Sequence, residues 1–294
     1  MVKPNPGRGP APSPLEPGLY ITATPIGNAR DVTLRALDVL RESDAIVAED
    51  TRTTAKLLAI HAISRPLLAY NDHNAPRMRP AILARLARGE RIALVSDAGM
   101  PLISDPGYKL VKAALAAETK VHVIPGASAA LAALVLSALP TDRFLFAGFL
   151  PSARAARRSA LAELKSATCS LIFFEAPQRL AESLRDMCEV LGARQAAVAR
   201  ELTKLHEDVR RDELCALADL YKSGSPPRGE ITIVVGPPPE ALPDWTHADA
   251  LLDRALAYMP ARTAAEFVSD ALHLPRRLVY NRAIARKDSP DHDG

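Results

Sequence analysis

The residues best suited to chemistry lie in the segment 96–107, which carries two carboxylates (Asp97, Asp105), two glycines and two prolines. Glycine allows a ligand to approach the backbone closely, and proline fixes the shape of a loop. The segment is neither a dinucleotide fingerprint nor a phosphate loop, because it contains no Gly-x-Gly-x-x-Gly and no Gly-Lys-Ser/Thr. A stiff structural turn is the alternative, but the composition favours a loop that holds a ligand.

This loop follows an apolar run at 92–95 and precedes a helical pattern, as in an open α/β sheet whose ligands lie beyond the carboxyl ends of the strands. Helical periodicity separates similar apolar runs, which predict strands. The first set predicts a mostly parallel sheet and comprises 19–23, 45–48, 66–70, 92–95 and 121–124. A second set comprises 144–149, 170–174, 196–199 and 231–235.

The 294 residues are too many for one comfortable core, so two α/β domains and a small appendage are expected. Pro4 to Pro17 include six prolines, which is typical of a disordered tail. Helical periodicity near the end predicts helices at 246–258, 262–272 and 275–287. The predicted organisation is a proline-rich tail at 1–17, α/β domains at 18–125 and 126–237, a helical unit at 245–287 and a tail at 288–294.

The composition, 48% hydrophobic and 24% charged, is that of a packed globular protein. No apolar run is long enough to span a bilayer, and no secretory signal is visible. Cys169, Cys188 and Cys215 are far apart, so we expect neither a zinc site nor a disulfide, as in a reducing cytoplasm. A net charge of +3 neither requires nor excludes an RNA partner.

Several motifs together resemble the ribosomal RNA small subunit methyltransferase I family, within the tetrapyrrole methylase-like superfamily. The motifs occur in register at 21–28, 49–52, 96–107, 125–129, 174–180, 199–207 and 228–230. The resemblance implies two α/β domains with S-adenosylmethionine held in a cleft between them. It also implies 2'-O-methylation of a cytidine in the decoding region of 16S rRNA, a 30S substrate and a homodimer.

The donor has an adenosine, a zwitterionic tail and a sulfonium, so its site needs apolar walls, polar partners and no competing cation. The resemblance and the strand ends assign donor contacts to Pro25, Asp97, Ala98, Gly99, Met100, Ala127, Ser128, Glu175 and Ala176. Two alternatives stay open. Ser128 also suits a helix N-cap, and Pro25 also suits a tight turn before a helix that Asp31 or Thr33 caps.

Methyl transfer to a ribose hydroxyl depends mainly on positioning, which is worth roughly 7–11 kcal/mol, whereas a general base adds about 10²–10⁴-fold. Glu201 and Lys204 follow a predicted strand and are the candidate catalytic residues. A lysine needs a lowered pKa to act as a base. A phosphate-binding role for Lys204 is the alternative that the sequence favours.

Candidate RNA contacts are basic residues near the cleft and on helices. They are Arg52 held by Asp50, then Arg154, Arg157 and Arg158, and Arg276 and Arg277. The alternatives are an ion pair of Asp50 with Arg52 that caps a helix, and ordinary solvated helix faces.

Two other functions were weighed against rRNA methylation. A tetrapyrrole methyltransferase would share the scaffold, but the basic C-terminal segment argues against it. An assembly factor that binds RNA without methylating would not need the intact 96–107 loop.

Overall fold

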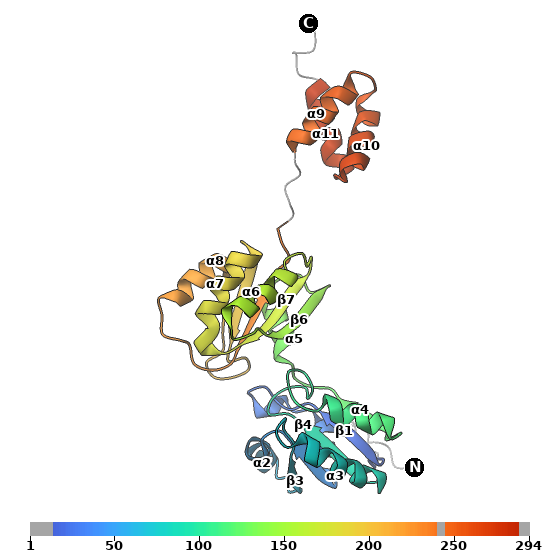
Figure 1. Cartoon of the computed structure of the whole chain (residues 1–294), viewed down its shortest axis with the longest axis vertical. Coiled ribbons are helices and arrows are strands. Elements are labelled where there is room, and N and C mark those ends of the chain that lie inside the picture. Colours follow the sequence, from blue (N-terminus) through green and yellow to red (C-terminus); the bar gives the residue numbers. More distant parts are fainter. Residues whose placement is uncertain (1–13, 240–244, 288–294) are drawn as a thin grey trace, which may run out of the picture. The chain divides into compact units, whose positions relative to one another are not determined.

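The computed structural model describes residues 14–239 and 245–287. Most of the predicted proline-rich tail and all of the predicted tail at 288–294 lie outside these residues. The chain divides into two compact units, 1–238 and 239–294. The first unit contains two five-stranded sheets, and the second contains helices (Figure 1).

The first sheet is entirely parallel, with the strand order β3-β2-β4-β1-β5. Its strands are β1 (Gly18–Thr22), β2 (Ala45–Ala48), β3 (Leu67–Ala69), β4 (Arg91–Val95) and β5 (Val121–Ile124). Its helices are α1 (Leu34–Glu42), α2 (Thr51–Ile60), α3 (Ala75–Ala87) and α4 (Tyr108–Ala116), with a 3-10 turn at Ala29–Asp31. The predicted mostly parallel sheet is therefore confirmed.

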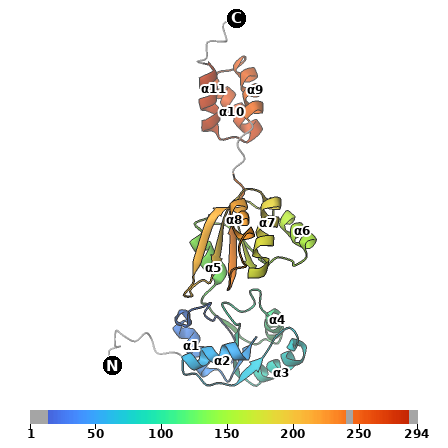
Figure 2. The same ribbon diagram turned by 90° about the vertical axis from the view of Figure 1, so that its left-hand side faces the viewer.

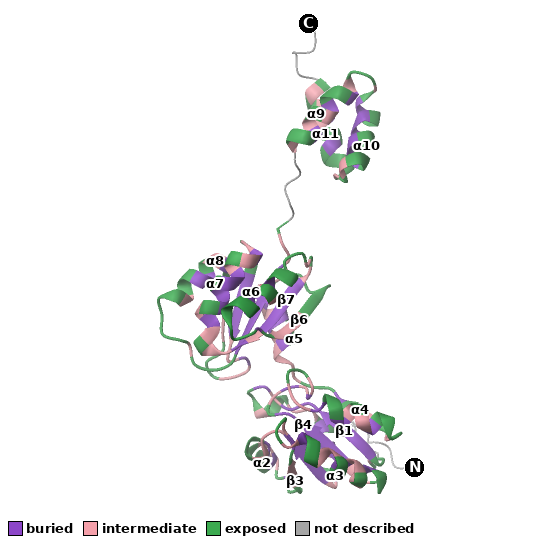
Figure 3. Ribbon diagram, in the orientation of Figure 1, coloured by how far each residue is buried: buried purple, intermediate pink, exposed green. Residues whose placement is uncertain are grey.

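Helices cover both faces of this sheet. Successive side chains of a strand point to opposite faces, so neighbouring residues of one strand belong to different cores. Ile92 and Leu94 of β4 pack against α3 and α4. Ala93 and Val95 pack on the other face against α1 and α2. Figure 3 shows the buried strands between more exposed helices. This double coverage explains why the strands are continuous apolar runs in the sequence.

The second sheet is mixed and has the order β6-β7-β10-β8-β9. Only β6 and β7 are parallel neighbours. The strands are β6 (Phe144–Phe149), β7 (Ser170–Glu175), β8 (Gln195–Arg200), β9 (Asp208–Glu213) and β10 (Ile231–Val235). The helices are α5 (Ala129–Ser137), α6 (Arg154–Glu163), α7 (Leu180–Leu191) and α8 (Leu214–Lys222), with a 3-10 turn at Pro177–Arg179. Strand β9 was not predicted.

Helix α5 covers one face of the second sheet, and α6, α7 and α8 cover the other (Figure 2). Leu171 and Phe173 of β7 belong to the core under α7, whereas Ile172 between them belongs to the core under α5. The α5 core also contains Ile26 and Leu202, which follow β1 and β8. This cluster joins the two sheets of the unit through buried apolar contact.

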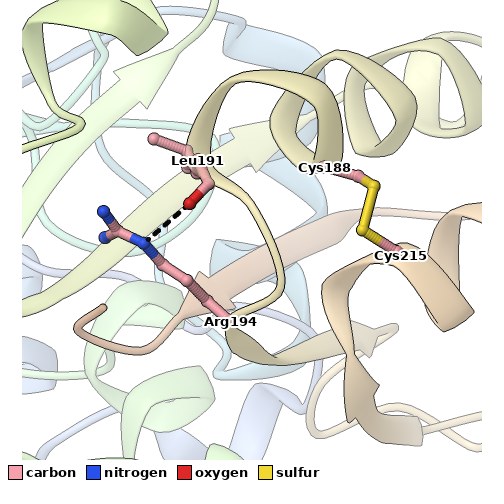
Figure 4. The surroundings of a disulfide bond; sticks show 4 residues. All are labelled: Cys188, Leu191, Arg194 and Cys215. Atoms are coloured by element: carbon pink, nitrogen blue, oxygen red, sulfur yellow. Dashed lines mark hydrogen bonds between the residues drawn. A yellow bond between two sulfur atoms is a disulfide. The ribbon is translucent and has the colours of Figure 1, made fainter. Parts of the chain in front are cut away.

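The expectation of no disulfide is wrong. Cys188 of α7 and Cys215 of α8 are bonded to each other, while Cys169 is free (Figure 4). The two cysteines are 27 residues apart in sequence, but α7 and α8 pack side by side and bring their Cα atoms to 5.1 Å. At the end of α7, the buried Arg194 donates from Nε to the carbonyl oxygen of Leu191.

The second unit contains three helices within the described residues, α9 (Trp245–Leu256), α10 (Ala261–Leu272) and α11 (Arg276–Lys287). Each matches a predicted helix to within about two residues. Ala248, Leu252, Ala264, Val268 and Val279 meet in a core of the unit's own. His273, which has a left-handed backbone conformation, caps the end of α10. Three residues, 273–275, separate α10 from α11, which gives a helix-turn-helix.

Candidate functional site

A cavity of about 370 Å³ lies where the loops of the two sheets meet within the first unit. The first sheet contributes the segments that follow β1 and β4, and the start of α5, which follows β5 and packs on the second sheet, also lines the cavity. The second sheet contributes the carboxyl ends of β6 and β7 and the start of β10. The loop 96–107 thus lies beyond a strand's carboxyl end and lines a cavity, as predicted for a ligand loop.

The wall from the first sheet is held by an exchange of backbone hydrogen bonds. Thr24 N donates to Gly99 O at 2.9 Å, and Gly99 N donates to Thr24 O at 3.1 Å. Gly99 has a φ of +78°, and a Cβ there would lie 3.4 Å from Cγ2 of Ile26. Glycine suits this left-handed conformation, whereas a Cβ at 3.4 Å would make only an ordinary contact.

The wall from the second sheet centres on Glu175, whose side chain is buried. Ser183 Oγ donates to Oε2 of Glu175 at 2.5 Å, and Ala176 N donates to Oε1 at 2.8 Å. Phe149 and Phe174 make an edge-to-face contact beside it, with ring centroids 5.6 Å apart. A buried carboxylate that receives hydrogen bonds is held in one orientation.

The cavity has mostly apolar walls, with acidic side chains and the hydroxyl-bearing residues Ser104, Ser128 and Thr232 among its lining residues. Apolar side chains of Ile26, Met100, Ile103, Phe149, Phe174 and Ile231 line it. Three carboxylates, Asp105, Glu175 and Glu230, also line it, and none of the lining residues is Lys, Arg or His. This residue set fits a ligand that joins a flat apolar ring to a positive charge.

Two acidic residues at this side of the cavity, the lining residue Asp105 and the nearby Glu49, have raised pKa values. Burial raises the pKa of Asp105, and the charge of Asp97 adds to the rise. Burial also raises the pKa of Glu49 to about 7, helped by the charges of Asp105 and Asp97. When either group loses its proton, the added negative charge favours the arrival of a cation.

Six of the nine predicted donor contacts line the cavity: Ala98, Gly99, Met100, Ser128, Glu175 and Ala176. Pro25, Asp97 and Ala127 are not lining residues. Asp97 instead accepts a hydrogen bond from Asp50 N at 3.1 Å. Ser128 is also the N-cap of α5 and accepts from Leu131 N. The N-cap alternative is therefore confirmed, at a residue that also lines the cavity.

Sequence reasoning had not assigned several lining residues to the donor site, Asp105, Phe149, Phe174, Glu230 and Ile231 among them. Asp105, Phe174 and Glu230 belong to motifs that the sequence analysis had recognised. Phe149 and Ile231 carried no signal beyond their apolar strands. They reach the cavity because β6 and β10 both adjoin β7.

Lys204 connects two acidic side chains at the rim of the cavity. Its Nζ lies 2.7 Å from Glu201 Oε1 and 3.1 Å from Glu230 Oε2. Burial lowers the pKa of Lys204, but the hydrogen bonds to Glu201 and Glu230 outweigh it and leave this pKa raised. The hydrogen bond from Lys204 holds the pKa of Glu201 below its ordinary value. These directions disfavour proton transfer to Lys204 at neutral pH.

Two glycines fit closely around this group. A Cβ at Gly27 would lie 2.5 Å from Cγ of Lys204, and a Cβ at Gly229 would overlap the carboxyl group of Glu201. Asn28 N also donates to Thr203 Oγ1 at 3.1 Å. The segments after β1, after β8 and before β10 are therefore packed together beside the cavity.

Asp50 caps α2 and forms an ion pair with Arg52 at 2.6 Å. Hydrogen bonds from Arg52 lower the pKa of Asp50 to about 2. The Arg52 side chain is 86% exposed. The ion-pair alternative is thus realised, and the guanidinium remains open to solvent.

One predicted RNA contact requires correction. The side chain of Arg157 is 2% exposed and lies 2.7 Å from Oδ2 of the equally buried Asp186. Arg154 and Arg158 also pair with Asp186 and with Glu189. Arg157 therefore holds α6 on α7 and cannot reach RNA, although Arg154 and Arg158 remain at the surface.

In the second unit, Arg276 and Arg277 are exposed at the start of α11. Arg276 pairs with Asp270 at 3.2 Å. Within residues 14–239 and 245–287, no helix is long and apolar enough to cross a membrane. The same residues contain no cluster of three His, Cys, Asp or Glu side chains arranged to hold a metal ion.

Comparison with known proteins shows which families the two units match. Residues 18–218 match the family model "Tetrapyrrole (Corrin/Porphyrin) Methylases", and residues 243–287 match "RsmI C-terminal HTH domain". A ribosomal RNA small subunit methyltransferase I of Mesorhizobium japonicum is 47% identical, over 96% of each chain. That of Erythrobacter litoralis is 52% identical, over 93% of this chain and 97% of its own.

The chain belongs to the ribosomal RNA small subunit methyltransferase I family. The chain has the tetrapyrrole methylase fold, which solved structures of lower identity also show. Diphthine synthase aligns with a TM-score of 0.59 and 15% identity, over 74% of this chain and 89% of its own. Cobalt precorrin-4 methyltransferase aligns with a TM-score of 0.56 and 16% identity, over 74% and 94%. This member of the family is a methyltransferase.

Proposed function

We propose that this enzyme transfers a methyl group from S-adenosylmethionine to the ribose 2'-oxygen of a cytidine in the decoding region of 16S rRNA. The observation that carries the proposal is the cavity with apolar walls, three carboxylates and no cationic side chain among its lining residues. These residues fit an adenosine and a sulfonium. A uroporphyrin-III C-methyltransferase from Thermus thermophilus with the same fold, at 18% identity, was solved with S-adenyl homocysteine.

In this proposal Ile26, Met100 and Phe174 enclose the adenine, and Asp105 and Glu230 attract the positive charge. When bound, the donor supplies an electrophilic methyl group on its sulfonium. The rigid walls around Gly99 and Glu175 fix the site at which the ribose hydroxyl must arrive. Positioning of this kind supplies most of the acceleration, about 7–11 kcal/mol. Glu201 and Lys204 remain our catalytic candidates, although the ion pair between them favours a positioning role.

Arg52 beside Asp50, Arg154 and Arg158, and Arg276 and Arg277 are the proposed RNA contacts. The side chains of Arg52, Arg154 and Arg158 are partly or fully exposed, and Arg276 and Arg277 are exposed at the start of α11. Pro25, Asp97 and Ala127 are proposed to act on the donor through the lining residues that adjoin them. We further propose the 30S particle as the substrate, a homodimer as the assembly and the cytoplasm as the compartment.

The test is methyl transfer from labelled S-adenosylmethionine to purified 30S subunits that lack the modification, followed by nucleoside analysis. We expect a 2'-O-methylated cytidine. Asp105→Asn should lower kcat/KM about tenfold, because it removes one charge from the cavity, whereas Asp142→Asn should not. Asp142 matches the charge change and lies in an exposed loop. A labelled base, or no label in RNA, would refute the proposed reaction.

A further inference from the structure

Five arginines on the described helices of the second unit fall into two structurally different sets. Arg282 of α11 donates to both carboxylate oxygens of Asp249 on α9, with its guanidinium 4.6 Å above the Trp245 ring. Arg286 bonds Asp249 at 3.0 Å and Asp253 at 2.7 Å. These two arginines hold α11 against α9, so their charges are neutralised within the unit.

The second set surrounds a groove between α10 and the start of α11. This groove has a volume of about 350 Å³, and Arg262, Arg276, Arg277 and Tyr280 line it together with Ala265 and Glu266. Arg262 pairs with Glu266 at 3.8 Å, and Arg276 pairs with Asp270 at 3.2 Å. Both pairs are solvent-exposed, so they are weak and can exchange for a stronger anion.

Arg277 and Tyr280 are the residues of the groove with free polar groups. Neither side chain has a hydrogen bond or ion pair to another described residue, and both are exposed. Three guanidinium groups beside an open aromatic ring match the two parts of a nucleotide. The arginines suit the phosphate, and the ring suits the face of a base.

The form of RNA can be chosen on physical grounds. The major groove of an A-form duplex is too deep and narrow for side chains to read, so α11 cannot use it as a helix-turn-helix uses DNA. An unpaired base, in contrast, exposes both faces and stacks on an aromatic side chain. We propose that the groove between α10 and α11 binds an unpaired nucleotide of the RNA, with its base on Tyr280 and its phosphates on Arg276, Arg277 and Arg262.

This inference rests on the proposed RNA substrate and narrows it to a single-stranded feature. The test uses the full chain and two labelled RNAs of equal length, a hairpin with an unpaired loop and a blunt duplex, in fluorescence anisotropy titrations. Tyr280→Leu should weaken hairpin binding about tenfold and leave duplex binding within about twofold. Tyr280→Phe keeps the ring and should bind the hairpin like the wild type.

Arg277→Ala should weaken binding of both RNAs and reduce the slope of log K against log salt by about one. Arg254→Ala is the matched control, since Arg254 is exposed on α9 and belongs to neither set. Thermal melts of each variant verify folding. The proposal is overturned if Tyr280→Leu and Arg277→Ala bind like Arg254→Ala, or if Tyr280→Leu weakens both RNAs equally.

Methylation of 30S subunits, measured in parallel, separates the two proposals. If 30S subunits are methylated but the Tyr280→Leu variant binds the hairpin as tightly as the wild type, only the proposal for the groove is refuted. Hairpin binding that depends on Tyr280, without methylation of cytidine, would refute the proposed reaction alone.

Discussion

Nη2 of Arg157 lies 2.7 Å from Oδ2 of Asp186, and each side chain is no more than 2% exposed. Burial alone would raise the pKa of Asp186, but Arg157 and Arg154 outweigh it and lower this pKa. The pair is therefore ionic, and it joins α6 to α7 inside the protein. The sequence predicts Arg154, Arg157 and Arg158 as a basic surface, but the middle residue, Arg157, instead joins α6 to α7 inside the protein.

Removal of Arg157 should destabilise the protein severely. Arg157→Met leaves the Asp186 carboxylate buried without its main partner, which costs about 3–5 kcal/mol. Urea unfolding followed by circular dichroism measures the loss. Arg158→Met, on the exposed side of the same helix, should cost far less than this. Equal stability of the two variants would contradict the structural role of Arg157.

Lys204 should determine donor affinity more than the rate of the chemical step. Lys204→Met removes the ionic hydrogen bonds to Glu201 and Glu230; the bond to the partly buried Glu201 is worth about 1.5–3 kcal/mol and the bond to the exposed Glu230 less. We expect the Kd for S-adenosylhomocysteine to rise at least tenfold in calorimetry, while the pH profile of kcat keeps its shape. Lys222→Met, at the exposed end of α8, is the control. A large fall in kcat with an unchanged Kd would instead identify Lys204 as the base.

Affinity for the cationic donor should rise with pH around neutrality. Glu49 has a pKa raised to about 7, so it loses its proton as the pH increases through that value and adds negative charge near Asp105. S-adenosylmethionine should then bind about three- to tenfold more tightly at high pH. S-adenosylhomocysteine lacks the sulfonium charge and should change less. Glu49→Gln should remove the difference in pH dependence between the affinities for the two ligands. Calorimetry across the pH range measures these affinities.

The disulfide between Cys188 and Cys215 should stabilise the first unit. It closes a loop of 27 residues, for which chain entropy predicts about 2–4 kcal/mol. In a Cys169→Ser background, which removes the free thiol, reductant should lower the free energy of unfolding by this amount. Identical urea curves with and without reductant, or two free thiols in the denatured unreduced protein, would contradict the bond.

Much of the fold could be predicted because it depends on local patterns. The strands buried on both faces, such as β2 and β4, are uninterrupted apolar runs, and helices of the second unit show clear periodicity. Strand β9 was missed because its sequence, Asp208–Glu213, is mostly charged. It lies at the edge of the second sheet, where exposed charged residues are ordinary and no apolar signal is needed.

The loop after β4 and the end of β7 were predictable parts of the site, whereas the contributions of β6 and β10 were not. The composition of the loop after β4 indicated a ligand loop, so Ala98, Gly99 and Met100 were predicted as donor contacts. Ile231 and Phe149 could not be, because an antiparallel β10 and a parallel β6 reach the cavity only through their order around β7. The Arg157 side chain was misjudged for a related reason, since helix packing, not sequence spacing, brings Asp186 beneath it.

Because Thr24 and Gly99 exchange two backbone hydrogen bonds, the loop after β4 takes its shape when the chain folds. Ordering a backbone costs about 1–2 kcal/mol of conformational entropy for each residue. That cost is met during folding, so an arriving ligand does not have to meet it again. The cavity is thus preorganised on this side, and the affinity for a ligand is not reduced by the cost of ordering this part of the loop.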